Sequence, residues 1–324
     1  MSRFVPSLEL LPRALAGEVP AIARLLSRAE AGAPECREAL ARAYALAGKA
    51  HVVGVTGVPG SGKSTLVSVL AGRLRAAGHK VAIIAVDPSS PFSGGSIMGD
   101  RIRMSDVASD PGVFIRSMAT RGAVGGMARA TLDAVDVLDA AGFGVVVIET
   151  VGVGQDEVEI AHASHTTLVV SAPGLGDDIQ AIKAGILEIA DVHVVSKGDR
   201  PDANRTLVDL KAMLAIESSL GAPRPWQPPV VATSALTGAG VDELLAELAR
   251  HRAYLQGSEA GRLRVRRIAE FRMLKHAEEL LRLRFRERRA GRIDALTDGL
   301  VARRLSPHAA GLELLDGTDH GTRP

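Results

Sequence analysis

Residues 57–65 read Gly-Val-Pro-Gly-Ser-Gly-Lys-Ser-Thr, and they lie between an apolar run at 52–55 and a segment of helical pattern that begins near Lys63. The glycines let the backbone curl so that successive N–H groups point at one anionic centre. A helix that begins at such a loop adds further N–H donors and the positive end of its dipole. This order of strand, loop and helix predicts a P-loop, which is a binding site for the phosphates of a nucleoside triphosphate.

The side chains of this loop have separate expected roles. Lys63 can reach the β- and γ-phosphate oxygens, and the Ser64 hydroxyl can coordinate Mg²⁺. The expected nucleotide contacts in this stretch are Gly57, Pro59, Gly60, Ser61, Gly62, Lys63, Ser64 and Thr65. Lys63 is also a candidate catalytic residue, because a cation at the γ-phosphate stabilises the charge that develops in phosphoryl transfer.

The composition limits the other classes of function. With 324 residues, 46% of them hydrophobic, the chain can bury the core of one large domain plus appendages. It contains no apolar run of membrane-spanning length and begins without the apolar segment of a signal peptide, so we expect no membrane insertion and a cytoplasmic location. The single cysteine, Cys36, rules out an intramolecular disulfide framework. A net charge of +2 gives no general basic field for nucleic acid.

The charge is unevenly distributed along the chain. Residues 250–304 contain sixteen Arg or Lys and seven Asp or Glu, so this segment is basic while the rest is slightly acidic. We expect these side chains to form a solvated helical face, with an acidic partner surface as the alternative.

Apolar and helical patterns alternate after residue 50. The expected strands are 51–56, 80–86, 143–149, 166–171, 192–196 and 229–233. The expected helices are 63–77, 126–141, 155–164, 177–190, 203–219 and 240–251. This alternation predicts an α/β fold of the P-loop NTPase type, with a mostly parallel central sheet flanked by helices and ligands at the carboxyl ends of its strands.

Four regions follow from these patterns. Residues 1–48 have helical spacing and form an N-terminal helical segment, and 49–255 form the P-loop domain. Residues 256–310 form a C-terminal helical arm, predicted as two pieces at 262–289 and 293–305 that end at Ser306-Pro307. Residues 311–324 are expected to be a flexible tail.

Acidic residues at strand ends are the candidates for Mg²⁺ binding and catalysis. Glu149 ends an otherwise apolar strand and is followed by Thr-Val-Gly, which suggests a metal-shell or water-positioning carboxylate. Asp87 ends another strand and opens a long Ser, Gly and Pro loop that reaches Asp100. Both aspartates could hold Mg²⁺ through water, and Asp100 joins Lys63 and Glu149 as a candidate catalytic residue.

The base-recognition signal follows the strand at 192–196. There, Ser196-Lys197-Gly198-Asp199 matches the Asn-Lys-x-Asp motif of GTPases except at its first position. The Asp199 carboxylate could accept hydrogen bonds from guanine N1–H and the 2-amino group, and adenine offers neither donor. Ser196 in place of Asn removes a side-chain amide and is expected to weaken the guanine site. A further contact to guanine O6 is expected from the Ser-Ala-Leu stretch Ser234, Ala235 and Leu236.

With these elements placed, the chain resembles the MeaB/ArgK family of methylmalonyl-CoA mutase-associated GTPases, within the SIMIBI class of P-loop proteins. The resemblance covers roughly residues 8–310 and is marked, besides the P-loop, by four blocks. These are DPSSPFSGGSIMGDRIRM at 87–104, IRSMATRG at 115–122, ETVGVGQ at 149–155 and PGLGDDIQAIKAGILEIAD at 173–191.

The resemblance implies a GTPase that uses GTP, GDP and Mg²⁺ and chaperones an adenosylcobalamin-dependent acyl-CoA mutase. GTP binding and hydrolysis would be coupled to cofactor loading, protection or reactivation of the mutase, and the methylmalonyl-, isobutyryl- and 2-hydroxyisobutyryl-CoA enzymes stay open as the one served. It also implies a homodimer joined through the C-terminal arm.

The resemblance also assigns individual residues. Lys63 and Ser64 would hold phosphate and Mg²⁺, and Lys197 and Asp199 would select guanine. The metal and water site would be shaped by Asp87, Asp100 and Glu149. The block at 173–191 looks like the third switch of the family, with Gln155, Asp178, Gln180 and Lys183 expected to communicate with the partner.

Three alternatives remain. A nickel metallochaperone GTPase would need clustered metal ligands, yet the nine histidines are scattered and the pair His162 and His165 stands without cysteine. A small-molecule or transport-associated kinase would need an acceptor pocket and a base of its own, for which the sequence shows no constellation. A partition-type ATPase carries an additional lysine near the start of the P-loop, where this chain has Val58.

Overall fold

The computed structural model describes residues 4–87, 104–119, 129–150, 156–174, 186–220 and 225–316. They form two compact units, Met1–Arg272 and Met273–Pro324, which are taken separately below.

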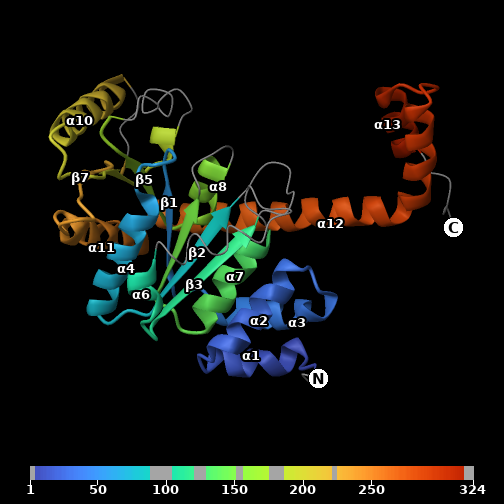
Figure 1. Cartoon of the computed structure of the whole chain (residues 1–324), viewed down its shortest axis with the longest axis horizontal. Helices are drawn as coiled ribbons and strands as arrows, with labels where there is room; N and C mark the ends of the chain where they lie inside the picture. The colour runs from blue at the N-terminus through green and yellow to red at the C-terminus, as the bar shows by residue number, and fades with distance from the viewer. Residues whose placement is uncertain are drawn as a thin grey trace. The chain divides into compact units, whose positions relative to one another are not determined.

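A seven-stranded sheet is the centre of the first unit (Figure 1). Its order is β3-β2-β4-β1-β5-β6-β7, and every neighbouring pair is parallel. The strands are β1 (His51–Thr56), β2 (Val81–Asp87), β3 (Val113–Ala119), β4 (Val145–Thr150), β5 (Thr166–Ser171), β6 (Val192–Val195) and β7 (Val230–Ala232). The predicted α/β architecture is confirmed, and the described sheet is parallel throughout. The sequence analysis missed β3, because Arg116 and Ser117 interrupt its apolar pattern.

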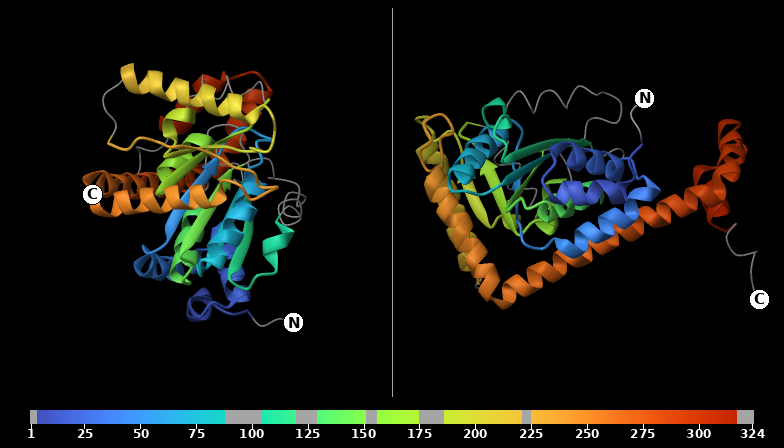
Figure 2. Two further views of the ribbon diagram at one scale, coloured as in Figure 1. Left: turned by 90° about the vertical axis from the view of Figure 1, so that its left-hand side faces the viewer. Right: turned by 90° about the horizontal axis from the view of Figure 1, so that it is seen from below.

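Helices cover both faces of this sheet (Figure 2). Alternate residues of one strand point to opposite faces, so Val146 and Ile148 enter one apolar core while Val145 and Val147 enter the other. The described helices between residues 57 and 257 are α4 (Lys63–Ala76), α6 (Ser105–Ala108), α7 (Arg129–Ala140), α8 (Asp156–Ala163), η2 (Ile186–Ile189), α10 (Ala203–Leu220) and α11 (Val241–Gly257). α4 and α11 contribute to the second core, and α7 and α8 to the first.

The N-terminal helices share the first of these cores. They are α1 (Ser7–Leu15), α2 (Val19–Glu30), η1 (Pro34–Cys36) and α3 (Arg37–Leu46). Leu25 and Ala43 lie in the same buried cluster as Val146 of the central strand β4. The helical content predicted for residues 1–48 is therefore present, and these helices pack as a layer of the first unit.

The helix α12 (Glu259–Val301) begins against the first unit. The Arg264 guanidinium lies 2.6 Å from Asp191 Oδ2, and Arg272 Nη1 donates to Asp136 Oδ1 at 2.9 Å. The arm predicted from residue 256 thus starts as a packed element of this unit. The predicted break at 290–292 is absent, because Ala-Gly-Arg contains no proline and a single helical glycine costs only about 1 kcal/mol.

The second unit contains the remainder of α12 and α13 (Pro307–Asp316). Arg303, at φ 54°, lies in the turn between them, and Leu296 and Ala310 are buried. Pro307 begins α13 instead of only ending the preceding helix, which suits proline at the first helical position. α13 continues to Asp316, past residue 311, where the sequence predicts the start of the tail. None of the described helices has the length and apolar character needed to cross a membrane.

Candidate nucleotide-binding site

The P-loop connects β1 to α4 at the carboxyl edge of the sheet (Figure 1). Gly57 adopts φ 140°, and a Cβ atom there would lie 2.1 Å from the carbonyl oxygen of Val170. Gly62, at φ 86°, caps the N-terminus of α4. Only glycine combines this backbone conformation with so close an approach to β5, so the loop's curvature depends on these residues.

Lys63 is the first residue of α4, and its side chain is buried. Its ammonium donates to the carbonyl oxygens of Gly57 at 2.6 Å and Val58 at 3.0 Å. These bonds hold the cation across the mouth of the loop, next to the backbone N–H groups at the start of the helix. The arrangement concentrates positive charge where the sequence predicts phosphate binding.

Ser64 and Glu149 meet beside the loop. The Ser64 hydroxyl donates to Glu149 Oε1 at 2.5 Å, and the glutamate side chain is buried. Glu149 is brought there by the pairing of β4 with β1, in which it lies opposite Val55. A hydroxyl and a carboxylate are the hard oxygen ligands that Mg²⁺ prefers, so this pair fits the ion expected with a nucleoside triphosphate.

The residues predicted to recognise the base follow β6 and β7. The Ser234 hydroxyl donates to Asp199 Oδ1 at 2.5 Å, and this hydrogen bond holds the pKa of the Asp199 carboxyl below its usual value. The Gly198 N–H donates to the carbonyl of Thr233 at 2.8 Å, which joins the two loops. Asp199 is exposed and anionic, and it can accept from a ligand that presents two N–H donors.

Ser196 and Lys197 tie this region to the P-loop. The Ser196 hydroxyl lies 2.5 Å from the carbonyl oxygen of Ser61 and 3.1 Å from that of Ser171. The Lys197 ammonium donates to the carbonyl of Gly60 at 2.9 Å, from a backbone with φ 54°. Thus the serine that replaces asparagine in the motif makes a bond between the base-recognition and phosphate loops. Its effect on guanine affinity stays a prediction.

The structure describes only some of the remaining predicted site residues. Pro59, Thr65 and Leu236 have exposed side chains. Asp87 ends β2, but its side chain is not described. Five predicted residues lie outside the described residues: Asp100, Gln155, Asp178, Gln180 and Lys183. The sequence analysis did not foresee Ser171, because it contributes a backbone carbonyl, which any residue type could supply.

A parallel sheet with a P-loop after β1, a carboxylate at the end of the adjacent β4 and a Lys-x-Asp segment after β6 defines a P-loop nucleoside triphosphatase. The family model described as "Methylmalonyl Co-A mutase-associated GTPase MeaB" matches residues 22–290, and this chain belongs to that family. The predicted family resemblance is therefore confirmed, and a guanine nucleotide is the ligand that membership implies.

Individual relatives agree with this assignment. A Pyrococcus abyssi protein named "Putative GTPase" is 48% identical over 259 residues, or 80% of this chain and 79% of that protein. A Mus musculus protein named "Methylmalonic aciduria type A homolog, mitochondrial" is 37% identical over 195 residues, or 59% of this chain and 46% of that protein. The crystal structure of an "LAO/AO transport system kinase" is similar with a TM-score of 0.66 and 26% identity, and the match covers 96% of both chains.

Proposed function

We propose that this chain hydrolyses GTP with the help of Mg²⁺ and serves as a chaperone of an adenosylcobalamin-dependent acyl-CoA mutase. The observation that carries the nucleotide part is a pair of hydrogen bonds: Ser196 bonds the Ser61 carbonyl of the P-loop, and Ser234 bonds the carboxylate of Asp199, three residues after Ser196. The mutase part is supported by membership of a family whose description names methylmalonyl-CoA mutase. GTP binding or hydrolysis would then control loading, protection or reactivation of the mutase cofactor.

The proposed reaction is in-line attack of water on the γ-phosphate. Lys63 exchanges its bonds to the Gly57 and Val58 carbonyls for phosphate oxygens, and the loop N–H groups stabilise the developing charge. Ser64 and Glu149 would hold the Mg²⁺ site, the glutamate directly or through water. The ion would supply further charge stabilisation on the phosphates.

Regulation by the partner follows from the energetics of such a site. Among the residues that the structure describes we assign no arginine to the transition state, and we expect slow intrinsic hydrolysis. A partner that completes the site would accelerate it, and by linkage the bound nucleotide would change partner affinity by the same factor.

We include a homodimer in this proposal. In the second unit, α12 carries several large apolar side chains that are at least two-fifths exposed, namely Met273, Leu274, Leu280, Leu281 and Leu283. A second copy of the arm would bury these apolar side chains. Light scattering should give twice the monomer mass, and Leu281→Glu should shift it towards the monomer. A monomeric mass for the wild-type chain would contradict this part.

The test of partner action is the rate of phosphate release from GTP with and without purified mutase. We expect the rate to rise with mutase concentration to a plateau, and the Lys63→Ala variant to stay inactive throughout. An unchanged rate at saturating mutase would refute partner activation while leaving intrinsic hydrolysis open to separate measurement.

The similar structure is named as a transport system kinase, so kinase activity is the second function to test. Transfer of phosphate to an acceptor would leave a phosphorylated product, whereas hydrolysis releases inorganic phosphate in amounts equal to the GDP formed. Equal amounts of phosphate and GDP would exclude the kinase function. For the nickel alternative, the described residues contain no group of three or more metal-binding side chains. A Ni²⁺ titration tests the rest of the chain.

A further inference from the structure

A second polar site lies at the amino edge of the same sheet. A cavity of about 430 Å³ is lined by the segment before β1, by the end of α11 and by the start of α12. Its wall includes His51, which begins β1, and His165, which directly precedes β5. β1 passes into the P-loop only at its other end, so this cavity is separate from the nucleotide site.

The charged side chains that line the cavity are all cationic, and the Asp139 carboxylate lies behind the wall, where it accepts from the Gly48 and Lys49 N–H groups. Its lining contains Lys49, Arg252, Arg262 and Arg264, and none of the described lining residues is Asp or Glu. Like charges gathered around one space repel each other, and this repulsion is relieved when an anion enters. The set therefore favours a negatively charged occupant.

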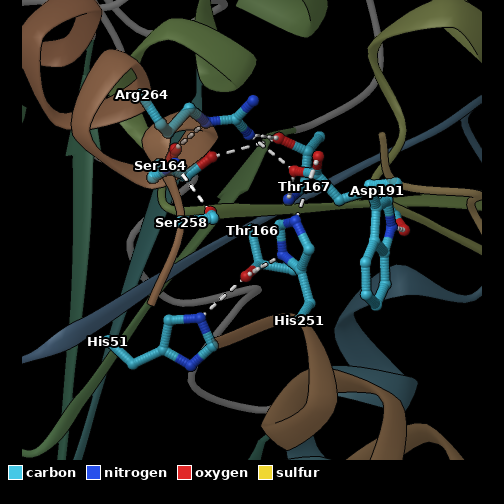
Figure 3. A network of polar contacts seen from close by, with 10 residues as sticks. His51, Ser164, Thr166, Thr167, Asp191, His251, Ser258 and Arg264 are labelled. Carbon is cyan, nitrogen blue, oxygen red and sulfur yellow. Dashed lines mark hydrogen bonds and ion pairs between the residues drawn. The ribbon is translucent and has the colours of Figure 1, made fainter. Parts of the chain in front are cut away.

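One of these four cations has a structural role. Arg264 lies 2.6 Å from Asp191 Oδ2 and donates to the carbonyl of Ser164 at 3.1 Å, as Figure 3 shows. These bonds fix the start of α12 against the segments that precede β5 and β6. The other guanidinium groups are less engaged: Arg252 donates to the carbonyl of Lys49 at 3.2 Å, and Arg262 is an exposed residue at the rim.

His165 adds a neutral donor to the cavity wall, and His51 is held beside it by a separate hydrogen bond. The Val52 N–H donates to His165 Nδ1 at 3.0 Å, so the proton of the neutral ring is on Nε2, which can donate. His51 Nε2 contacts the Thr166 hydroxyl at 2.7 Å, and that hydroxyl contacts His251 Nδ1 at 2.8 Å (Figure 3). Burial lowers the pKa of His51 to about 3 and that of His165 to about 4. The positive charge of Arg252 acts in the same direction on both rings.

We propose that this cavity binds a small organic anion, whose phosphate or carboxylate group is held by Arg252, Arg262 and Lys49. Guanidinium groups suit both acids because they donate two parallel hydrogen bonds. Ala50, Leu255 and Val265 also line the space and would contact a short apolar body of the ligand. The volume is in the lower part of the usual range for small-molecule sites, about 300–1,000 Å³.

The test is a titration of the full chain, with excess GDP and Mg²⁺ so that the P-loop is filled. The probes are inorganic phosphate, glycerol 3-phosphate, succinate and citrate. Binding is followed by calorimetry and by the imidazole NMR signals of His51 and His165. We expect at least one probe to bind with a Kd on the order of 1 mM or tighter and to shift both histidine signals. Preference for the phosphates or for the carboxylates identifies the acid group.

Variants separate the cavity from general charge effects. Arg252→Ala and Arg262→Ala should each weaken the preferred probe about tenfold, because each removes charge-assisted hydrogen bonds. Arg266→Ala is the matched control, since it removes an exposed arginine of α12 that does not line the cavity, and it should leave the affinity within about twofold. The proposal is overturned if no probe binds, if all bind equally weakly, or if both cavity variants behave like the control. Because the histidine signals locate binding at the amino edge, this outcome is independent of whether the chain hydrolyses GTP.

Discussion

At its carboxyl end, β1 passes into a glycine-containing loop whose carbonyl groups hold one buried lysine, Lys63. At its amino end, the same strand starts with a buried histidine beside a cavity surrounded by arginine and lysine side chains. The first site is constructed from backbone, and its residues are fixed by dihedral angles and close approach, as at Gly57. The second is constructed from side chains of three separate segments. The comparison teaches that β1 and β5 can support a backbone-built site for anions at one end and a side-chain-built site at the other.

The largest expected effect comes from removing the cation of the first site. Lys63→Ala should lower kcat for GTP hydrolysis by about 100- to 1,000-fold, because one preorganised charge at the phosphates is lost. Phosphate release measures it. The matched control is Lys80→Ala, which removes an exposed lysine immediately before β2 at the opposite edge and should leave kcat unchanged. An equal loss of kcat in both variants would contradict a specific role of Lys63 at the carboxyl edge of the sheet.

The next largest effect is expected at Asp199, whose carboxylate is predicted to determine specificity for the nucleotide base. Asp199→Asn should weaken GDP binding about 100-fold, since the amide replaces one acceptor oxygen by a donor. It should also improve binding of xanthosine diphosphate, whose ring presents a carbonyl where guanine has an amino group. Calorimetry with both nucleotides checks the exchange. If the variant loses affinity for both GDP and xanthosine diphosphate, the substitution disrupts the loop and does not change base specificity.

The amino edge should affect stability through pH. The folded-state pKa values of His51 and His165 lie below the unfolded value near 6.5, so the unfolded chain binds more protons between about pH 4 and 6.5. The stability they contribute is full above pH 6.5 and is lost on acidification. We expect a loss of several kcal/mol in the free energy of unfolding by pH 4, because each unit of pKa shift is worth about 1.4 kcal/mol. Denaturant titrations across this pH range measure it.

The control for this pH dependence is His51→Gln. Glutamine has no ionisable group and can still bond the Thr166 hydroxyl, which His51 contacts at 2.7 Å. The variant should therefore show a shallower fall of stability with acid than the wild type. The same slope in both proteins would contradict the assigned role of His51.

Ser196 gives the smallest of these effects. Ser196→Ala removes the bond to the Ser61 carbonyl, at a cost of about 1 kcal/mol, or about fivefold in GDP affinity. Ser196→Asn restores a donor amide and tests whether the motif of other GTPases binds more tightly in this chain. Unchanged affinity in both variants would show that the link between the two loops does not influence the nucleotide.

Much of the carboxyl edge could be predicted because its chemistry demands particular residues close together in sequence. Gly57, Lys63 and Asp199 are of this kind. β3 was missed because Arg116 interrupts its apolar run, and that arginine is accommodated by Glu30 of α2, whose Oε2 lies 2.5 Å away. A carboxylate supplied from 86 residues away leaves no local pattern. The amino-edge cavity was not predicted for the same reason, since residue 49, His165 and Arg262 come together only in the fold.

At Lys197, thermal stability and nucleotide binding favour different residues. A side-chain-bearing residue in the left-handed region costs about 1 kcal/mol relative to glycine. Lys197→Gly should therefore relax the backbone and raise the melting temperature if the lost bond to the Gly60 carbonyl is worth less than that strain. The same exchange would remove the aliphatic stem on which the purine ring is expected to rest. Selection for heat resistance alone would favour the glycine, and selection for a working nucleotide switch would keep the lysine.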